Sequence, residues 1–303
     1  MSASTPSAGG PAPQGTEGVR GRSAFGAALA EAMDAHGPLC VGIDPHRELL
    51  GAWGLGDDAA GLRDFCLRAV EAVGGRVAAV KPQSAFFERH GAAGIAVLEQ
   101  TLAALRECGT LAVLDVKRGD IGSTMAGYAQ AYLVDGAPLA ADAITVSPYL
   151  GYGSLTPALN LAEANGRGVF VLALTSNPEG VGVQHAVNGD QAVAAGIVEG
   201  VTASNAQASG EGRLGSIGLV IGATVGGAVS DLGIDLQRAN GPLLAPGVGA
   251  QGAGPTELES VFGAARRQVL ASTSRGVLKA GPSIETLRKA ALASAYEAAT
   301  ALR

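Results

Sequence analysis

Three charged side chains lie close together in the pattern Asp-x-Lys-x-x-Asp: Asp115, Lys117 and Asp120. They follow the apolar residues 111–114, which are typical of a buried strand. Side chains alternate along a strand, so Asp115 and Lys117 are expected on the same side. Asp120 comes after the expected end of the strand, where Gly119 allows a turn. Carboxylates on both sides of an ammonium favour its charged form, so Lys117 is predicted to be a proton donor and a poor Schiff-base nucleophile.

A second cation, Lys81, follows the apolar residues 77–80, and Pro82 favours an extended backbone at Lys81. With Asp115, Lys117 and Asp120 it would form an array of alternating charge. The alternative interpretation of this pattern is a surface cluster of ion pairs. Polar residues after the other apolar runs favour a functional site over that alternative, and these are Asp44, Ser147, Thr175, Ser176, Gln251 and Arg275.

The elements that would position these residues repeat along the chain, because stretches with a helical apolar stripe alternate with short apolar runs. The runs comprise residues 38–44, 77–80, 111–114, 143–146, 169–174, 218–221, 243–245 and 269–271. Runs that are apolar on both faces indicate parallel strands covered by helices. Eight such units predict a (β/α)₈ TIM barrel with a parallel eight-stranded core, in which reactive groups lie at the carboxyl ends of the strands. An open doubly wound sheet is the alternative, but it would leave the last third of the chain unexplained.

The first residues differ in character from the rest. Residues 1–22 are rich in Ser, Pro, Gly and Ala and are predicted to be a flexible tail. Residues 23–303 are predicted to form a single TIM-barrel catalytic domain. Its first helix would bury Phe25, Leu29 and Met33, which fall on one helical face.

The composition narrows the function classes. The chain has 303 residues, 47% of them hydrophobic, with a net charge of −6 and 4% aromatic residues. This charge and the few aromatic residues argue against nucleic-acid partners. Apolar runs shorter than the ~18 residues of a membrane span argue against a membrane protein. The odd count of three cysteines predicts buried thiols in a reducing compartment, and the cytoplasm is the expected location.

The last two apolar runs are followed by residues suited to phosphate. Gly247-Val-Gly249 follows the seventh run and Ser274-Arg275-Gly276 follows the eighth, which is where TIM barrels often bind phosphate. Ordinary tight turns are the alternative. Residues 247–252 also match G-x-G-x-x-G, but the acidic residue expected about 20 positions later in a dinucleotide-binding unit is missing. We therefore predict no nicotinamide cofactor. The four histidines are scattered without metal-ligand spacing, so no metal is predicted.

At these residues the sequence resembles the orotidine 5′-phosphate decarboxylase family. The resemblance covers nearly all of the chain after residue 22, and it is specific through the order of its motifs. They are Val-Gly-Ile-Asp at 41–44, Val-Lys-Pro at 80–82, Asp-x-Lys-x-x-Asp-Ile at 115–121, Ala-Leu-Thr-Ser-Asn-Pro at 173–178, Ala-Pro-Gly-Val-Gly-Ala-Gln-Gly at 245–252, and Ser-Arg at 274–275. Gly122-Ser123 stands where compact members have Pro-Asn, and Lys-Arg-Gly-Asp at 117–120 is similar to a longer-chain branch.

The resemblance implies a barrel without cofactor or metal that converts orotidine 5′-monophosphate to UMP and CO₂ in de novo pyrimidine synthesis. Lys117 would protonate C6 of the pyrimidine, and Asp115 would lie near the departing carboxylate. Lys81 and Asp44 would hold the ribose and orient the charges.

The resemblance also implies further substrate-binding residues. Ser176 would contact the pyrimidine, and Gln251 and Arg275, with the neighbouring Ser274, would bind the phosphate. The family forms a homodimer that shares its active sites. The resemblance therefore implies that Asp120, Ile121 and Thr124 serve the site of the partner subunit.

Two other functions remain as alternatives. One is a metal-dependent sugar-phosphate decarboxylase or aldolase of the same barrel superfamily, which shares Asp-x-Lys-x-x-Asp. Such enzymes have a metal-binding Glu on the second strand, where this chain has Lys81. The other is a non-catalytic sensor of a phosphate-bearing ligand, which would not need the complete array of charges.

Overall fold

The computed structural model describes residues 23–248 and 252–302. The predicted N-terminal tail, residues 1–22, lies outside the described residues, and so does the candidate phosphate ligand Gln251.

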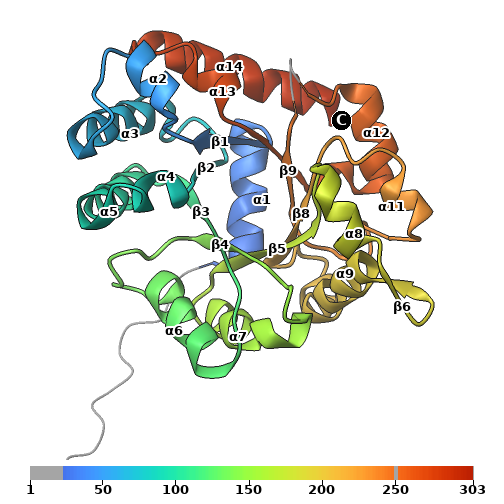
Figure 1. Ribbon diagram of the computed structural model, residues 1–303. Coiled ribbons are helices and arrows are strands. Elements are labelled where there is room, and N and C mark those ends of the chain that lie inside the picture. Colours follow the sequence, from blue (N-terminus) through green and yellow to red (C-terminus); the bar gives the residue numbers. More distant parts are fainter. Residues whose placement is uncertain (1–22, 249–251, 303) are drawn as a thin grey trace, which may run out of the picture.

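Eight parallel strands of the described chain close into a barrel (Figure 1). Their order around the barrel is β1-β2-β3-β4-β5-β8-β9-β10, and β10 pairs back onto β1. The strands are β1 (Leu39–Ile43), β2 (Ala79–Pro82), β3 (Leu111–Arg118), β4 (Ala143–Val146), β5 (Gly168–Leu174), β8 (Ile217–Ile221), β9 (Leu243–Pro246) and β10 (Val269–Thr273). The closed order confirms the TIM barrel and excludes the open doubly wound sheet.

The strands form where the sequence is apolar on both faces, because each lies between two hydrophobic cores. One core fills the barrel and includes Cys40, Val113 and Phe170. The other lies between the barrel and its helices and includes Val41, Leu114 and many residues of the helices. All five residues of β1 are accordingly buried.

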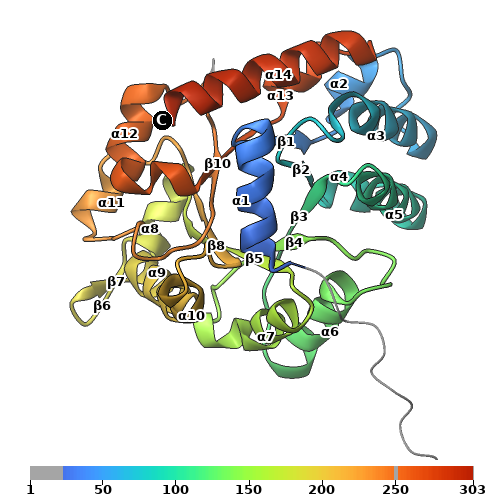
Figure 2. The same cartoon turned by 180° about the vertical axis from the view of Figure 1, so that it is seen from behind.

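Helices surround the barrel (Figure 2). They are α2 (Arg47–Ala52), α3 (Ala59–Val73), α4 (Ala85–Glu88), α5 (Gly91–Glu107), α6 (Gly122–Leu133), α7 (Thr156–Ala164), α8 (Val181–Gln184), α9 (Val193–Ser204), α10 (Ala206–Gly210), α11 (Ala228–Asp231), α12 (Pro255–Phe262), α13 (Arg275–Leu278) and α14 (Ile284–Ala301). Short 3₁₀ turns occur at Tyr152–Leu155, Pro178–Gly180 and Gly263–Gln268. Helix α3 shows how a capping residue and an apolar stripe in the sequence specify a helix on the barrel. Asp58 caps its first turn by accepting a hydrogen bond from the Gly61 N–H at 2.8 Å, and its apolar face is buried.

Helix α1 (Phe25–His36) closes the end of the barrel opposite the carboxyl ends of the strands. Both views show it within the ring of strands (Figures 1 and 2). Phe25 and Leu29 are buried in the barrel core, as the helical stripe predicts. The Phe25 ring meets that of Phe170 edge-on, with centroids 5.9 Å apart. A side chain at Gly168 would clash with the Phe25 ring, so glycine permits this contact.

Three details differ from the sequence-based expectation. Strand β2 begins at Ala79, two residues later than the apolar run. A small antiparallel hairpin, β6 (Val187–Asn188) with β7 (Gln191–Ala192), was not predicted. Cys40 and Cys66 are buried as expected, but Cys108 is exposed because it ends α5 at the surface, where its thiol donates to the Leu105 carbonyl. Among the described residues, no helix is long and apolar enough to cross a membrane.

Candidate active site

A cavity of about 760 Å³ lies at the carboxyl ends of the barrel strands. Because all strands of the barrel are parallel, their carboxyl ends meet at one rim, and the residues after different strands come together there. Seven of the predicted catalytic and substrate-binding residues line this cavity: Asp44, Lys81, Asp115, Lys117, Ser176, Ser274 and Arg275. The candidate Thr175 lines it as well.

Asp115 is the centre of the site. Its carboxylate accepts hydrogen bonds from Lys81 Nζ at 3.0 Å and from Lys117 Nζ at 2.6 Å. The Thr145 hydroxyl donates a third bond at 2.7 Å. The side chains of Asp115 and Lys81 are 7% and 8% exposed, whereas that of Lys117 is 45% exposed. Asp115 and Lys81 therefore form a buried ion pair, and the more exposed Lys117 ammonium reaches into the cavity.

The charges in the array stabilise one another. Burial alone would raise the pKa of Asp115, but the ammonium groups of Lys81 and Lys117 and hydrogen bonds from Lys117 and Thr145 lower it to about 2. Burial alone would lower the pKa of Lys81, but the carboxylates of Asp115 and Asp44 outweigh this effect, so its pKa is raised. Asp115 is thus an anion and Lys81 a cation at neutral pH.

The backbone at Lys117 has an unusual conformation. Its φ is +45°, a region that residues other than glycine rarely adopt. The pairing of β3 with β4 shifts here, because Leu114 pairs with Ile144 and Arg118 with Val146, so three residues of β3 lie opposite one residue of β4. Asp115 and Lys117 do meet as predicted, but through a bulge rather than through regular strand alternation.

The segment that follows Lys117 leads away from the cavity. Asp120 is partly exposed and its carboxylate accepts the Ile121 N–H at 2.8 Å, while the Ile121 side chain is 62% exposed. Asp120, Ile121 and Thr124 do not line the cavity. The predicted array of four charges is therefore present only as Lys81, Asp115 and Lys117 within the described chain. Gly119 is needed for a close approach, since a side chain there would meet the Ser147 carbonyl oxygen at 2.3 Å.

Next to the array, β1, which pairs with β2, and the loop after β10 lie very close together. A side chain at Gly42 would be 2.9 Å from Ser274 Cβ, so glycine lets these segments approach. Asp44 Oδ1 and Ser274 Oγ are buried and have no hydrogen-bond partner among the described residues. Buried polar atoms are nearly always paired, so these two are suited to a polar ligand in the cavity.

Two cations line the cavity after β10, Arg275 at the start of α13 and Lys279 just after it. Lys279 was missed by sequence reasoning, although its spacing of four residues from Arg275 is the one that puts side chains on the same helical face. Gly247 and Gly276 line the cavity next to them and leave room for a bulky anion. His46 and Thr145 also line it and were not predicted.

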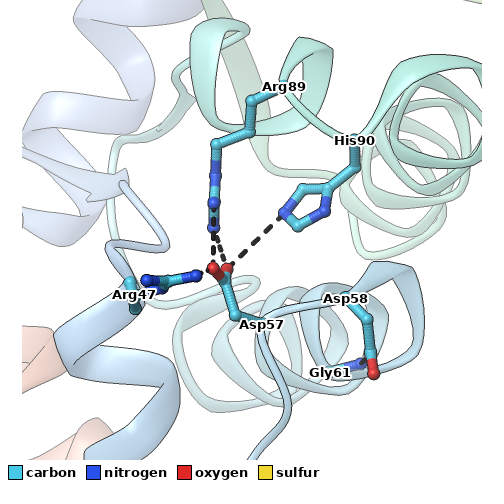
Figure 3. A network of polar contacts seen from close by, with 6 residues as sticks. All are labelled: Arg47, Asp57, Asp58, Gly61, Arg89 and His90. Atoms are coloured by element: carbon cyan, nitrogen blue, oxygen red, sulfur yellow. Dashed lines mark hydrogen bonds and ion pairs between the residues drawn. The ribbon is translucent and has the colours of Figure 1, made fainter.

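Beside the site, Asp57 connects the loops that follow β1 and β2 (Figure 3). Its carboxylate accepts from Arg47 Nε at 2.8 Å and from both terminal nitrogens of Arg89. His90 Nε2 lies 3.9 Å away. Arg47 begins helix α2, which follows Asp44, and Arg89 follows helix α4, which comes after Lys81. Asp57 therefore links the segments that follow two cavity residues. Hydrogen bonds from Arg89 and Arg47 hold the Asp57 pKa well below its usual range.

We expect Asp57→Asn to lower the Tm at pH 7 by a few degrees, because the amide cannot accept from both arginines as an anion does. Asp57 has a depressed pKa in the folded state, so its contribution is present above the unfolded pKa of about 3.9 and is lost as the pH falls below it. The Tm difference between wild type and variant should therefore shrink below about pH 4. Thermal unfolding followed by circular dichroism measures this. Asp64→Asn, which removes an exposed pair with Arg68, is the control and should leave the Tm unchanged. An equal Tm for wild type and Asp57→Asn at pH 7 would contradict the assigned role.

No group of three or more His, Cys, Asp or Glu side chains in the described part of the chain is arranged to hold a metal ion. The carboxylates of the cavity are Asp44 and Asp115, and Lys81 lies with them. An ammonium in this position repels a divalent cation.

A closed parallel barrel with charged side chains at the carboxyl ends of its strands defines a TIM-barrel enzyme. Residues 37–290 match the model of the orotidine 5′-phosphate decarboxylase / HUMPS family, and the chain belongs to that family.

The relatives agree with this assignment. The chain is 59% identical over 280 residues to a protein of Streptomyces coelicolor named orotidine 5′-phosphate decarboxylase, which covers 92% of this chain and 98% of the relative. A protein of the same name from Salinispora arenicola is 57% identical, over 88% and 94% of the two chains. A solved structure of Leishmania donovani OMP decarboxylase is 30% identical, with a TM-score of 0.72 over 92% of this chain and 98% of that one.

Proposed function

We propose that the protein decarboxylates orotidine 5′-monophosphate to UMP and CO₂, using Lys117 as the proton donor and no cofactor. The observation that carries this proposal is the position of Lys117 Nζ, which lies 2.6 Å from Asp115 Oδ1 and reaches into the cavity. Family membership and relatives above 55% identity that bear the name of this activity support the substrate.

In the reaction, the bond between C6 and the carboxyl carbon breaks and its electron pair stays on C6. The Lys117 ammonium stabilises this charge and then transfers a proton to C6, and the neutral amine regains a proton from water. The carbanion has no neighbouring electron sink, so the barrier must fall by an amount near the top of the ~8–23 kcal/mol range of enzymes. A fixed ammonium in a partly buried site supplies such stabilisation without reorganisation.

Asp115 has two roles in this proposal. Its low pKa keeps it anionic, so it holds Lys81 in its charged form and accepts the hydrogen bond from Lys117 Nζ. It would also face the carboxylate of the bound substrate, and the repulsion between the two anions would be relieved when CO₂ leaves.

The remaining residues are proposed to bind the nucleotide. The unpaired Asp44 Oδ1 is suited to a ribose hydroxyl, with Lys81 next to it. Ser176 would contact the pyrimidine. Arg275, assisted by Lys279, Ser274 and Gln251, would bind the phosphate, where a guanidinium can make two parallel hydrogen bonds.

We further propose a homodimer with shared active sites. Asp120, Ile121 and Thr124 face away from their own cavity and would complete that of the partner subunit. Exposed apolar side chains support an interface at this rim, since Ile121 after β3 and Tyr149 and Leu150 after β4 are 62%, 79% and 52% exposed. The same proposal takes residues 23–303 as one catalytic domain acting in cytoplasmic pyrimidine synthesis.

The test is to follow the loss of orotate absorbance with purified protein and no added metal, with and without EDTA. We expect turnover that EDTA does not change, because the chemistry rests on Lys117 and its ion pairs. Turnover that EDTA abolishes and Mg²⁺ restores would favour a metal-dependent sugar-phosphate enzyme of the same superfamily. Binding of UMP without any turnover would favour a sensor.

A further inference from the structure

Thr145 connects the two central residues of the site. It lies on β4, is 1% exposed and lines the cavity beneath Lys117. Its hydroxyl donates to Asp115 Oδ1 at 2.7 Å and accepts the backbone N–H of Lys117 at 2.9 Å. A threonine hydroxyl has one hydrogen and a carboxylate can only accept, so the direction of both bonds is fixed.

The bond to the Lys117 backbone compensates for a lost strand contact. The bulge in β3 interrupts its pairing with β4 between Leu114 and Arg118. The Lys117 N–H has no ladder partner there and uses the Thr145 hydroxyl instead. Without that oxygen, an N–H donor would be left unsatisfied beside the cavity, which is costly.

The same bond helps to hold Lys117 at its φ of +45°. A non-glycine residue keeps such a conformation only where its surroundings enforce it, and such residues cluster at active sites. A relaxed backbone at Lys117 would point the side chain elsewhere and separate Nζ from Asp115. The hydroxyl therefore acts on the backbone of one reactive residue and on the carboxylate of the other.

We propose that Thr145 is a positioning residue that sets the distance and direction between the Lys117 ammonium and the Asp115 carboxylate. The proposal rests on the proposed function, because it concerns the proton donor of that reaction. Thr145 itself does not need to touch the substrate. Threonine in a buried strand is usually explained by its preference for strands, but here the hydroxyl has two specific partners.

Three variants test this role. Thr145→Val keeps the branched shape and removes the hydroxyl, and Thr145→Ser keeps the hydroxyl. Thr101→Val is the matched control, because Thr101 is fully buried and its hydroxyl interacts with the Val97 carbonyl and the Cys66 thiol, neither of which lines the cavity. We expect Thr145→Val to lower kcat about 100-fold, the effect of a small misplacement of a reacting group, with little change in KM. Thr145→Ser should recover most of kcat. Thr101→Val should lower the Tm while leaving kcat unchanged.

Crystal structures of wild type and Thr145→Val give a readout that does not need turnover. We expect Lys117 Nζ to move out of hydrogen-bond distance of Asp115 Oδ1 in the variant, from 2.6 Å in the wild type. A variant with wild-type kcat, a serine variant without recovery, or an unchanged Lys117 would each overturn the positioning role. If wild type fails to turn over orotidine 5′-monophosphate, the proposed function is wrong, and the two structures alone decide the role of Thr145.

Discussion

Lys117→Ala is expected to lower kcat by about 10⁴-fold or more, because it removes both the electrostatic stabilisation of C6 and its proton source. The variant should still fold. The Lys117 side chain is 45% exposed, so its loss opens no cavity in the core, and Asp115 keeps its bonds to Lys81 and Thr145. UMP should still bind, since the phosphate and ribose contacts remain. Absorbance assays measure kcat, and calorimetry measures UMP binding.

The matched control is Lys289→Ala, which removes an exposed lysine on α14 far from the cavity and should leave kcat unchanged. Retention of more than about 1% of wild-type kcat by Lys117→Ala would contradict its role as proton donor, because general acid catalysis alone contributes 10²–10⁴-fold.

Mixing two inactive variants is expected to restore activity if the sites are shared between subunits. Lys117→Ala lacks the proton donor, and Asp120→Asn lacks the carboxylate proposed to enter the site of the partner subunit. In a hybrid dimer, one site combines an intact Lys117 with an intact Asp120. Random exchange makes half of the dimers hybrids with one good site of two, so activity should return to about a quarter of wild type.

The measurement requires subunit exchange, for example by mild denaturation and refolding of the mixed variants. Each variant treated alone is the control and should stay inactive. Absence of recovery in a mixture shown to contain hybrids would exclude a site completed by Asp120 of the partner subunit.

The barrel could be predicted from the sequence because its strands are buried on both faces. Runs such as 169–174 lie between two hydrophobic cores, so they are apolar throughout and easily recognised. The hairpin of β6 and β7 could not be recognised in this way, because strands of two residues are too short to show periodicity. Closure of the ring was inferred from the count of eight units, and the pairing of β1 with β10 confirms it.

The site was predictable where it depended on position along a strand. Asp44, Lys81 and Asp115 follow or end apolar runs, and parallel strands bring such residues to one rim. The bulge at Lys117 was not predictable, because it depends on how β3 pairs with β4. Thr145 was missed since a threonine within an apolar run is typical of any strand. The role proposed for Asp120 requires a second subunit, which one sequence does not position.

Closure of one end of the barrel by helix α1 has a consequence for how the Lys117 ammonium would regain its proton. Helix α1 seals that end, and the space above it is filled by apolar side chains such as Leu244 and Leu270. Such apolar side chains cannot relay a proton from that end of the barrel. In the proposed reaction, the Lys117 amine left after each turnover would therefore be recharged through the mouth of the cavity, by which the product would also leave, so regeneration of the acid and release of the nucleotide would share one route.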